Sequence, residues 1–390
     1  MSHGLISHSP DLRRLRDEGY DLGVEAGLLV IRDVPYVTPA PGVAYGTLVS
    51  ELTLDGDATA RPSDHVVRFN GETPCDTHGQ PLDRIIIGSG LEQLAPGIEV
   101  THTFSSKPAD GYEDYFEKIT TYVAILESPA QALDPQVTAR TFPPVKPADS
   151  SSVFAYEDTA SSRAGIAHLT PRLEIGKVAI VGLGGTGSYI LDLLAKTPVQ
   201  EIHLFDGDRF HTHNAFRAPG AASIEQLRQR QTKVSYLQER YVNMHVHVVA
   251  HEHFIDTDSV DQLRDMAFVF LAIDGGSGKQ VIVEHLEDFG VPFIDVGLGV
   301  WNNGEQLGGQ VRVTTSTPDR RESRRWISFS AGDAVDDYDR NIQIAELNAL
   351  NAALAVIRWK KWCGFYFDPE QEHQTVYEVD GNRLQNEDHQ

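Results

Sequence analysis

The sequence predicts an α/β protein, in which a doubly wound, mainly parallel sheet follows a smaller α+β domain. Three observations predict this division. Residues 141–152 are rich in proline and serine, as in a linker. After them, apolar strand-like runs alternate with helical patterns, which is typical of parallel sheets. Before them, short strand-like runs accompany one helical pattern. We therefore expect an N-terminal domain over residues 1–145, a linker over 146–162 and the doubly wound domain over 163–390.

In the N-terminal region the expected strands are short and the expected helix is single. The β-like runs cover residues 27–34, 46–54 and 84–88, and the helical pattern covers 112–127. No motif in this region indicates a particular chemistry, so its role is left open.

The C-terminal region contains a series of strand-like runs that predict the strands of a parallel sheet. These runs cover residues 177–182, 201–206, 246–254, 268–274 and 292–297, followed by 310–315. The first is continuously apolar, as expected of a strand buried on both faces. A long helix is predicted next, because apolar residues recur on one face at Ile344, Leu347, Leu350, Leu354 and Ile357. Gly364 is expected to end this helix.

Composition restricts the class of partner. The 390 residues include 56 acidic and 33 basic ones, giving a net charge of −23. This disfavours nucleic acid, whose affinity comes largely from clustered Lys and Arg. The two cysteines, Cys75 and Cys363, are too few for a disulfide framework or a four-cysteine zinc site. No signal peptide is recognisable and no apolar run approaches about 20 residues, so we expect a cytoplasmic protein without a membrane partner.

A glycine-rich turn follows the first strand of the C-terminal region. In VAIVGLGGTGSYILDLL, Gly182, Gly184 and Gly187 stand between a strand and a helix, where backbone N–H groups can approach a phosphate. Asp206 ends the next strand, at about the distance where an acidic residue meets ribose hydroxyls. These residues alone favour an NAD-dependent oxidoreductase, with a glycine turn that binds nothing as the alternative.

The residues after Asp206 favour a triphosphate instead. The segment DGDRFHTHNAFRAPG contains Asp208, Asn214 and Arg217, and Lys233 follows in the next helical pattern. A dehydrogenase needs no cation here, whereas an enzyme that acts on ATP does. Asp274 ends the fourth strand, at the sheet edge where ligands bind in open α/β folds.

Together these motifs resemble the ThiF/HesA/MoeB superfamily, which includes the adenylation domains of ubiquitin-activating enzymes, over residues 163 to about 358. The superfamily's GxGGxGS loop is matched at Gly182, Gly184, Gly185, Gly187 and Ser188. Its DxDxVxxSNLNRQ pattern is matched at Asp206, Asp208, Asn214 and Arg217, with departures at His213, Phe216 and Ala218. Its later lysine falls on Lys233, its metal-binding aspartate on Asp274, and the arginine of its opening SRQ on Arg163.

The resemblance implies a Rossmann-like adenylation domain that uses ATP and Mg²⁺. Asp206 and Asn214 would contact the ribose, Arg217 and Lys233 the β- and γ-phosphates, and Asp274 would hold Mg²⁺. Arg163 would reach the ATP of the partner subunit in a homodimer. The whole chain is similar to bacterial ThiF-type proteins with an additional N-terminal domain. That similarity implies a ubiquitin-like protein, activated at its C-terminal glycine, as substrate and a conjugating-enzyme-like protein as a further partner.

Several alternatives stay open at this point. The substrate could be a small-molecule or RNA-borne carboxylate, the activity could be NAD-dependent oxidoreduction, or the chain could be an inactive scaffold. Many superfamily members carry a catalytic cysteine after the fifth strand, but residues 297–337 contain neither cysteine nor histidine. We therefore expect direct transfer of the adenylate, with a hydroxyl ester as the alternative. Cys363 is interpreted as a packing residue, and so is Cys75, with a catalytic role for Cys75 as the alternative.

Two further patterns receive a structural interpretation. His245, His247, His251 and His253 alternate along an expected strand, and we interpret them as a solvated polar face rather than a metal cluster. The run DRRESRR, residues 319–325, is interpreted as a charged loop, with a contact to an acidic partner as the alternative.

Overall fold

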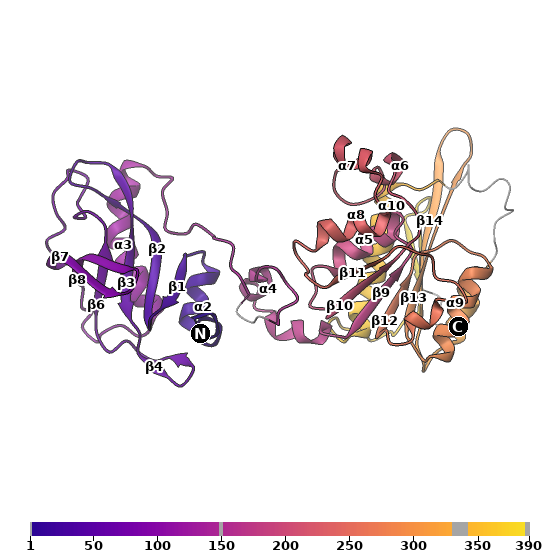
Figure 1. Ribbon diagram of the computed structural model, residues 1–390, viewed down its shortest axis with the longest axis horizontal. Helices are drawn as coiled ribbons and strands as arrows, with labels where there is room; N and C mark the ends of the chain where they lie inside the picture. Colours follow the sequence, from indigo (N-terminus) through magenta and orange to yellow (C-terminus); the bar gives the residue numbers. More distant parts are fainter. Residues whose placement is uncertain (1, 148–150, 330–341, 387–390) are drawn as a thin grey trace. The chain divides into compact units, whose positions relative to one another are not determined.

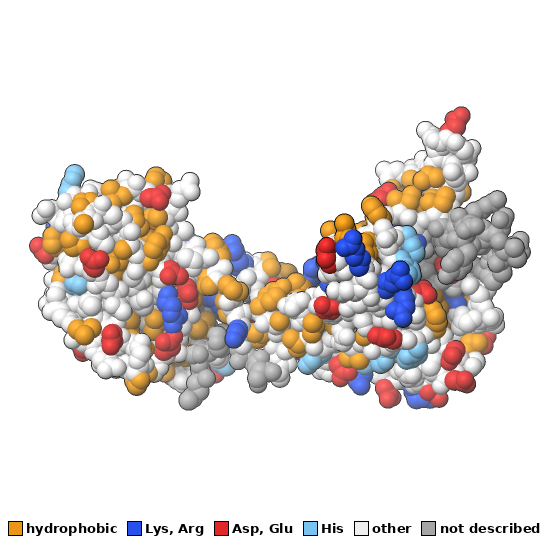
Figure 2. All heavy atoms as spheres, turned by 45° about the horizontal axis from the view of Figure 1, so that its top comes forward, with side chains coloured by type: hydrophobic (Ala, Val, Ile, Leu, Met, Phe, Trp, Pro, Cys, Tyr) orange, Lys and Arg blue, Asp and Glu red, His pale blue; other side chains and the backbone are white. Residues whose placement is uncertain are grey.

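The computed structural model describes residues 2–147, 151–329 and 342–386 (Figure 1). The chain forms two compact units. The N-terminal unit comprises Met1–Ser152 and Tyr156–Gly165, and the C-terminal unit comprises Val153–Ala155 and Ile166–Gln390. Residues 148–150 of the expected linker and 330–337 of the cysteine-free segment lie outside the described residues. Acidic, basic and hydrophobic side chains are interspersed over the visible face of each unit (Figure 2).

The N-terminal unit is an antiparallel sheet accompanied by helices (Figure 1). The sheet has the order β1 (Leu22–Glu25), β2 (Leu28–Val37), β3 (Val43–Glu51), β6 (Val66–Asn70), β8 (Ile98–Ser105) and β7 (Ile86–Ala95). A separate ribbon pairs β4 (Leu54–Asp55) with β5 (Ala58–Thr59). The helices are α1 (Ser2–His8), α2 (Pro10–Asp17), α3 (Tyr115–Leu133) and α4 (Thr159–Arg163). The predicted α+β class is confirmed.

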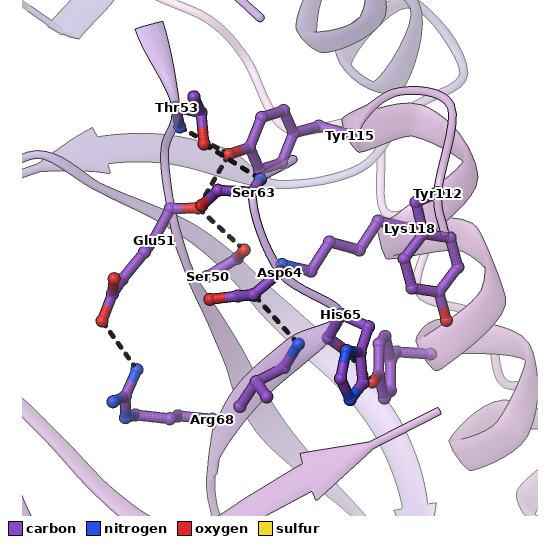
Figure 3. A network of polar contacts seen from close by, with 12 residues as sticks. Ser50, Glu51, Thr53, Ser63, Asp64, His65, Arg68, Tyr112, Tyr115 and Lys118 are labelled. Atoms are coloured by element: carbon purple, nitrogen blue, oxygen red, sulfur yellow. Dashed lines mark hydrogen bonds and ion pairs between the residues drawn. The ribbon is translucent and has the colours of Figure 1, made fainter. Parts of the chain in front are cut away.

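Helix α3 is fixed to this unit by a cap and by a buried ion pair. The helix begins at Tyr115 because the carboxylate of Asp114 accepts a hydrogen bond from the Glu117 N–H at 2.7 Å. One turn on, Lys118 is 1% exposed and its Nζ lies 3.0 Å from Asp64 Oδ1 (Figure 3). A buried ammonium without a counterion would be strongly destabilising. The pair therefore fastens α3 to the loop that precedes β6.

The C-terminal unit is a mixed, mostly parallel sheet with helices on both faces (Figure 1). Its order is β11 (Val248–His251), β10 (Glu201–Phe205), β9 (Lys177–Val181), β12 (Phe268–Leu271), β13 (Phe293–Asn302), β14 (Leu307–Ser316), β15 (Gln374–Glu378) and β16 (Arg383–Asn386). The first five strands pair in parallel and the last three pair antiparallel. The predicted doubly wound, mainly parallel, Rossmann-like sheet is confirmed. Its winding reverses at β9, between β10 and β12.

Two apolar cores cover the two faces of this sheet. Along β9, Val178 and Ile180 enter one core while Ala179 and Val181 enter the other, because successive side chains of a strand point to opposite faces. This explains the uninterrupted apolar run in the sequence. The helices are α5 (Gly185–Leu194), α6 (Thr212–Ala215), α7 (Ile224–Gln229), α8 (Lys233–Tyr241), α9 (Ser277–Asp288) and α10 (Ala345–Trp362), with 3-10 segments at Ala167–Leu173, Val260–Leu263 and Glu322–Trp326. Among the described residues, no helix is long and apolar enough to cross a membrane.

Several expected elements differ in extent from the structure. The strand expected over 268–274 ends at Leu271, so Asp274 lies in the following loop rather than at the strand end. The strand expected over 246–254 is shorter, since β11 covers only Val248–His251. The prediction of a charged loop over residues 319–325 is wrong for residues 322–325. Residues Glu322–Trp326 form a 3-10 helix, and Arg324 forms ion pairs with Glu284 and Glu287 of α9 at 3.0 and 2.7 Å. Local charge in the sequence did not reveal these acidic partners because they come from a distant helix.

Candidate functional site

The glycine turn after β9 is packed too tightly for most side chains. Gly182 has φ of +91°, and a Cβ there would lie 2.4 Å from the Ala272 carbonyl oxygen. A Cβ at Gly187 would lie 1.9 Å from the Gly182 oxygen, and one at Gly185 would lie 2.3 Å from Asn348 of α10. The turn is therefore held against the segment after β12 and against α10. Its backbone leads directly into the N-terminus of α5.

The N-terminus of α5 is positioned to receive an anion. Gly184 is its N-cap residue, and the space where a Cβ would lie is open. The first N–H groups of a helix have no partner within the helix and carry partial positive charge. Ser188 is turned inward, where its hydroxyl donates to the Gly185 carbonyl oxygen at 2.8 Å. The turn thus offers backbone donors rather than side chains.

Asp206 joins this turn to β10 and α8 through one buried network. Its carboxylate is 4% exposed, and Oδ2 accepts hydrogen bonds from the Leu183 N–H at 2.7 Å and from Lys233 Nζ at 3.3 Å. Oδ1 accepts from the Asp208 N–H at 2.8 Å, and Lys233 Nζ also donates to Asp208 Oδ2 at 2.6 Å. A carboxylate has about four acceptor positions and an ammonium three donors. One acceptor on Asp206 and one donor on Lys233 remain for a ligand.

Asn214 and Arg217 lie together on the short segment after β10. Asn214 is 4% exposed, and its side-chain oxygen accepts from the His211 N–H at 2.9 Å. The Arg217 N–H donates to the Asn214 carbonyl oxygen at 3.1 Å. Burial lowers the pKa of the nearby His213, and the charges of Arg217 and Lys233 add to the effect. The charges of Arg217 and Lys233, the two predicted phosphate-binding cations, therefore both lie near His213.

Asp274 stands on the other side of the switch point, in the loop between β12 and α9. Its side chain is exposed. Two residues later, Gly276 has φ of +139°, and the position of its Cβ faces open space. The solvent-facing side of this loop therefore has space for a ligand, and this is the side on which the predicted Mg²⁺ and phosphates would bind.

A buried ionic triad that was not predicted from the sequence lies next to this loop. Asp295 of β13 is fully buried and forms ion pairs with Lys279 of α9 and with Arg312 of β14, the latter at 2.8 Å. Lys279 Nζ also lies 3.4 Å from the carbonyl oxygen of Ile273, the residue before Asp274. Burial raises the pKa of Asp295, while the charges of Lys279 and Arg312 oppose the rise. An aspartate inside the apolar run 292–297 was the signal that could have indicated the triad.

Arg163 belongs to a different unit of the chain from the other predicted site residues. It ends α4 and belongs to the N-terminal unit, whereas the glycine turn, Asp206, Lys233 and Asp274 belong to the C-terminal unit. Its side chain is exposed and its guanidinium lies 5.1 Å from the centre of the Phe142 ring. Its role at the ATP of a partner subunit stays a prediction.

The expected solvated histidine face is wrong for His245. This residue is fully buried, its ring lies edge-on to that of Phe154 with ring centres 6.0 Å apart, and its Nε2 hydrogen-bonds to the Val199 carbonyl oxygen at 2.7 Å. His251 stacks on Phe205, with ring centres 4.2 Å apart. Burial, followed by the neighbouring histidines, lowers the pKa of His251 to about 4. Among the described residues, no group of three or more His, Cys, Asp or Glu side chains could hold a metal.

Both cysteines are protonated thiols. Cys75 is fully buried, its Sγ lies 3.3 Å from the Thr73 carbonyl oxygen, and burial raises its pKa. Burial raises the pKa of Cys363, at the end of α10, to about 12. Since the thiolate is the nucleophile, neither environment favours thioester chemistry.

Comparison with known proteins gives one family for each part of the chain. A model of the ThiF family matches residues 162–383, and a model of a domain of unknown function, DUF6791, matches residues 10–159. No curated protein matches the chain.

Several solved structures are similar to part of the chain. The E. coli MccB complex with MccA-N7isoASN is 17% identical, with 59% of this chain and 72% of that chain covered and a TM-score of 0.48. E. coli MccB with ATP is 18% identical, covering 56% of this chain and 65% of that chain, with a TM-score of 0.45. PaaA is 21% identical, covering 56% and 75%, with a TM-score of 0.42.

Proposed function

The chain belongs to the ThiF family of adenylyltransferase-like enzymes, and from this premise we propose that it adenylates the C-terminal glycine carboxylate of a ubiquitin-like protein. One observation supports the chemistry most directly. The glycine turn, Asp206 and Lys233 form a single buried network at the carboxyl edge of the sheet. That edge is where ligands bind in open α/β folds.

The proposed reaction needs charge neutralisation rather than a general base. A carboxylate oxygen attacks the α-phosphorus of ATP, forming an O–P bond, while the bond to pyrophosphate breaks and its electron pair leaves with the pyrophosphate. The nucleophile is already ionised near neutral pH. The site must instead bring several anions together and stabilise charge on the leaving group. The N-terminus of α5, Arg217 and Lys233 would supply this positive charge, while Asp206 and Asn214 would orient the ribose.

Asp274 would hold Mg²⁺ in this proposal. Mg²⁺ bound to a nucleotide takes only one or two protein carboxylates, because phosphates and water supply its other ligands. An exposed aspartate beside the open space at Gly276 fits that requirement. The metal would neutralise charge on the phosphates, and the triad of Lys279, Asp295 and Arg312 would fix the loop that carries Asp274.

We propose that the activated acyl group passes directly from the adenylate to a nucleophile of an acceptor, with release of AMP, and that a conjugating-enzyme-like protein is the candidate acceptor. Burial keeps Cys75 and Cys363 protonated, which disfavours a thioester. An ester on a hydroxyl of residues 297–337 would need an adjacent base, and that segment contains no histidine. The process is proposed to take place in the cytoplasm.

The proposed function is tested by ATP–pyrophosphate exchange in the presence of Mg²⁺. Exchange that requires a ubiquitin-like protein with an intact C-terminal glycine is the expected result, and mass spectrometry should detect its adenylate. Exchange with small-molecule carboxylates alone would favour the alternative substrate class. Calorimetry with ATP and NAD separates the remaining alternatives, because tight NAD binding without ATP binding would contradict adenylation altogether.

The proposed homodimer has its own test. If Arg163 acts on the ATP of the partner subunit, then Arg163→Ala and Asp274→Ala are each inactive alone. Mixed together under conditions of subunit exchange, they should recover part of the activity, because one hybrid site then has both groups intact. No recovery after demonstrated exchange would show that Arg163 does not act across the interface.

A further inference from the structure

The N-terminal unit contains an open hollow lined largely by arginine. Its volume is about 460 Å³, within the range of roughly 300–1,000 Å³ of small-molecule sites. Its charged lining residues come from helix α2 and the residue that caps it, from the end of α4 and from the segment that follows α3. They are Arg13, Arg14, Asp17, Glu18, Arg140 and Arg163. We call these six residues and the space they enclose the arginine pocket. All of them belong to the N-terminal unit.

The arginine pocket has an excess of positive charge in a chain whose net charge is −23. Four guanidinium groups face two carboxylates, a surplus of two positive charges. Glu18 is shared, since Arg14 and Arg140 lie 3.4 and 3.2 Å from it. Within the described part of the chain, neither Arg13 nor Arg163 has an ion-pair partner. Two guanidinium groups are therefore available to an anion.

The other carboxylate of the pocket, that of Asp17, already has partners within the N-terminal unit. Asp17 is paired with Arg16 at 3.2 Å and also accepts a hydrogen bond from the Ser162 hydroxyl. The Arg16 side chain is 5% exposed and forms a second ion pair, with Glu157 at 2.6 Å. These contacts join α2 to α4 and to Glu157, which precedes α4, and so they fix the relative positions of two of the segments that line the pocket. Asp17 adds little negative charge toward the hollow.

Aromatic rings hold three of the four guanidinium groups. Arg14 lies 3.7 Å from the centre of the Phe116 ring, Arg140 lies 5.4 Å from that of Tyr20, and Arg163 lies 5.1 Å from that of Phe142. Stacking of this kind reduces the rotamer freedom that an arginine loses when it binds a ligand. The pocket is therefore partly preorganised.

The backbone of Phe142, whose ring lies against the Arg163 guanidinium, is strained. Phe142 has φ of +49°, which is rare for a bulky residue. Its N–H donates to the Gly19 carbonyl oxygen at 2.9 Å, and a Cβ at Gly19 would lie 2.5 Å from the ring. Strained residues of this kind concentrate at binding and catalytic sites. The phenyl ring is nonetheless 54% exposed, so burial of the ring does not account for the strain.

We propose that the arginine pocket binds a dianionic phosphate group of a small molecule. Guanidinium groups pair with phosphate oxygens through parallel N–H···O bonds. Arginines that converge from three segments suit a tetrahedral group better than a planar carboxylate, and the surplus of two charges matches a dianion. The group could come from inorganic phosphate or pyrophosphate, or from a phosphate monoester such as AMP. The pocket is distinct from the glycine turn, Asp206, Lys233 and Asp274, which lie in the C-terminal unit, and it shares only Arg163 with the proposed adenylation site.

The test is isothermal calorimetry on the full chain with inorganic phosphate, pyrophosphate and AMP as separate probes. Asp274→Ala serves as the background, without Mg²⁺, to weaken binding at the nucleotide site. In that background Arg13→Gln should weaken the best probe at least tenfold, and Arg13→Gln with Arg140→Gln should abolish its binding. Arg84→Gln is the matched control, because Arg84 is an exposed arginine of the same unit outside the pocket. It should leave the affinity unchanged.

The outcomes separate the sources of the phosphate and can overturn the proposal. The tightest of the three probes identifies the form of phosphate that the pocket prefers. No binding of any probe at millimolar concentration, or binding that Arg13→Gln leaves unchanged, would overturn the proposal. So would a phosphate-free acidic peptide that binds more tightly than every probe and is lost in Arg13→Gln, since that would assign the pocket to a protein partner. Arg13→Gln should keep the pyrophosphate exchange of the otherwise wild-type chain.

Discussion

The basic side chains of the two candidate sites are supported in opposite ways. Lys233 and Lys279 of the C-terminal unit are 7% and 4% exposed, and each contacts at least one aspartate of its own unit. Arg13 and Arg163 of the arginine pocket are exposed and have no ion-pair partner within the described part of the chain. Losing a partner of a buried pair is strongly destabilising, whereas an exposed charge contributes little to stability. The buried lysines therefore set geometry, and the exposed arginines are available to a ligand.

The largest expected effect is the loss of Asp295, which tests the buried side of this comparison. Asp295→Ala would leave the buried Lys279 and the partly buried Arg312 without their counterion. It should lower the free energy of unfolding by about 3–5 kcal/mol. Thermal and urea unfolding measure it. Arg13→Gln should change the same quantity by less than about 0.5 kcal/mol. Asp265→Ala is a control at an exposed aspartate. Equal effects at positions 295 and 265 would refute the structural role of the triad.

Asp274 should affect activity rather than stability. Because it is exposed and is proposed to hold Mg²⁺, Asp274→Ala should lower pyrophosphate exchange by about 100-fold or more, as when one preorganised charge contact is removed. Its melting temperature should stay near that of the wild type. Lys279→Met adds a finer distinction. If Lys279 positions the Asp274 loop, this variant should raise the Mg²⁺ concentration needed for half-maximal exchange. A loss of stability without that shift would mean that Lys279 only stabilises the fold.

His251 predicts a smaller, pH-dependent effect. Its pKa is about 4 in the folded protein, because of burial and the neighbouring histidines, against about 6.5 in an unfolded chain. Between these values the unfolded chain binds the extra proton, so His251 destabilises the fold as pH falls from about 6.5 toward 4. His251→Phe keeps a ring on Phe205 without a titrating group. Its melting temperature should fall less between pH 7.5 and 5.0 than that of the wild type. The exposed His168→Phe is the control, and an equal change in both variants would contradict the assignment.

The parts of the site that the sequence predicts are the parts built from neighbouring residues. The glycine turn and Asp206 each belong to a strand and its following loop, so their spacing is visible in the sequence. The triad around Asp295 draws on α9, β13 and β14, and only tertiary structure brings these together. The arginine pocket likewise joins four charged residues at positions 13, 14, 17 and 18 to Arg140 and Arg163. These side chains look like ordinary surface charges in the sequence because nothing local shows that they share one hollow.

The long helix shows a further limit of periodicity. The expected apolar stripe ends at Ile357, which is 44% exposed, whereas Asn348 of the same helix is 1% exposed. Asn348 is buried because α10 packs against Gly185, where its amide also accepts a hydrogen bond from the Thr186 hydroxyl at 2.8 Å. Close approach to a glycine turn favours a small polar residue there. The period of the helix was visible in the sequence, but the face that it buries was decided by its neighbour.

The smallest expected effect is that of the two cysteines, of which Cys75 is fully buried and Cys363 is partly buried, both in packing roles. Burial raises the pKa of Cys75, and raises that of Cys363 to about 12, so both are thiols at neutral pH. The double variant Cys75→Ser with Cys363→Ser should keep both pyrophosphate exchange and single-turnover transfer within about twofold, because a serine hydroxyl can replace the Cys75 contact with Thr73. Any covalent adduct on the wild type should survive reducing agent. A thiol-sensitive adduct that disappears in Cys75→Ser alone would refute direct transfer and would place the second catalytic step in the N-terminal unit.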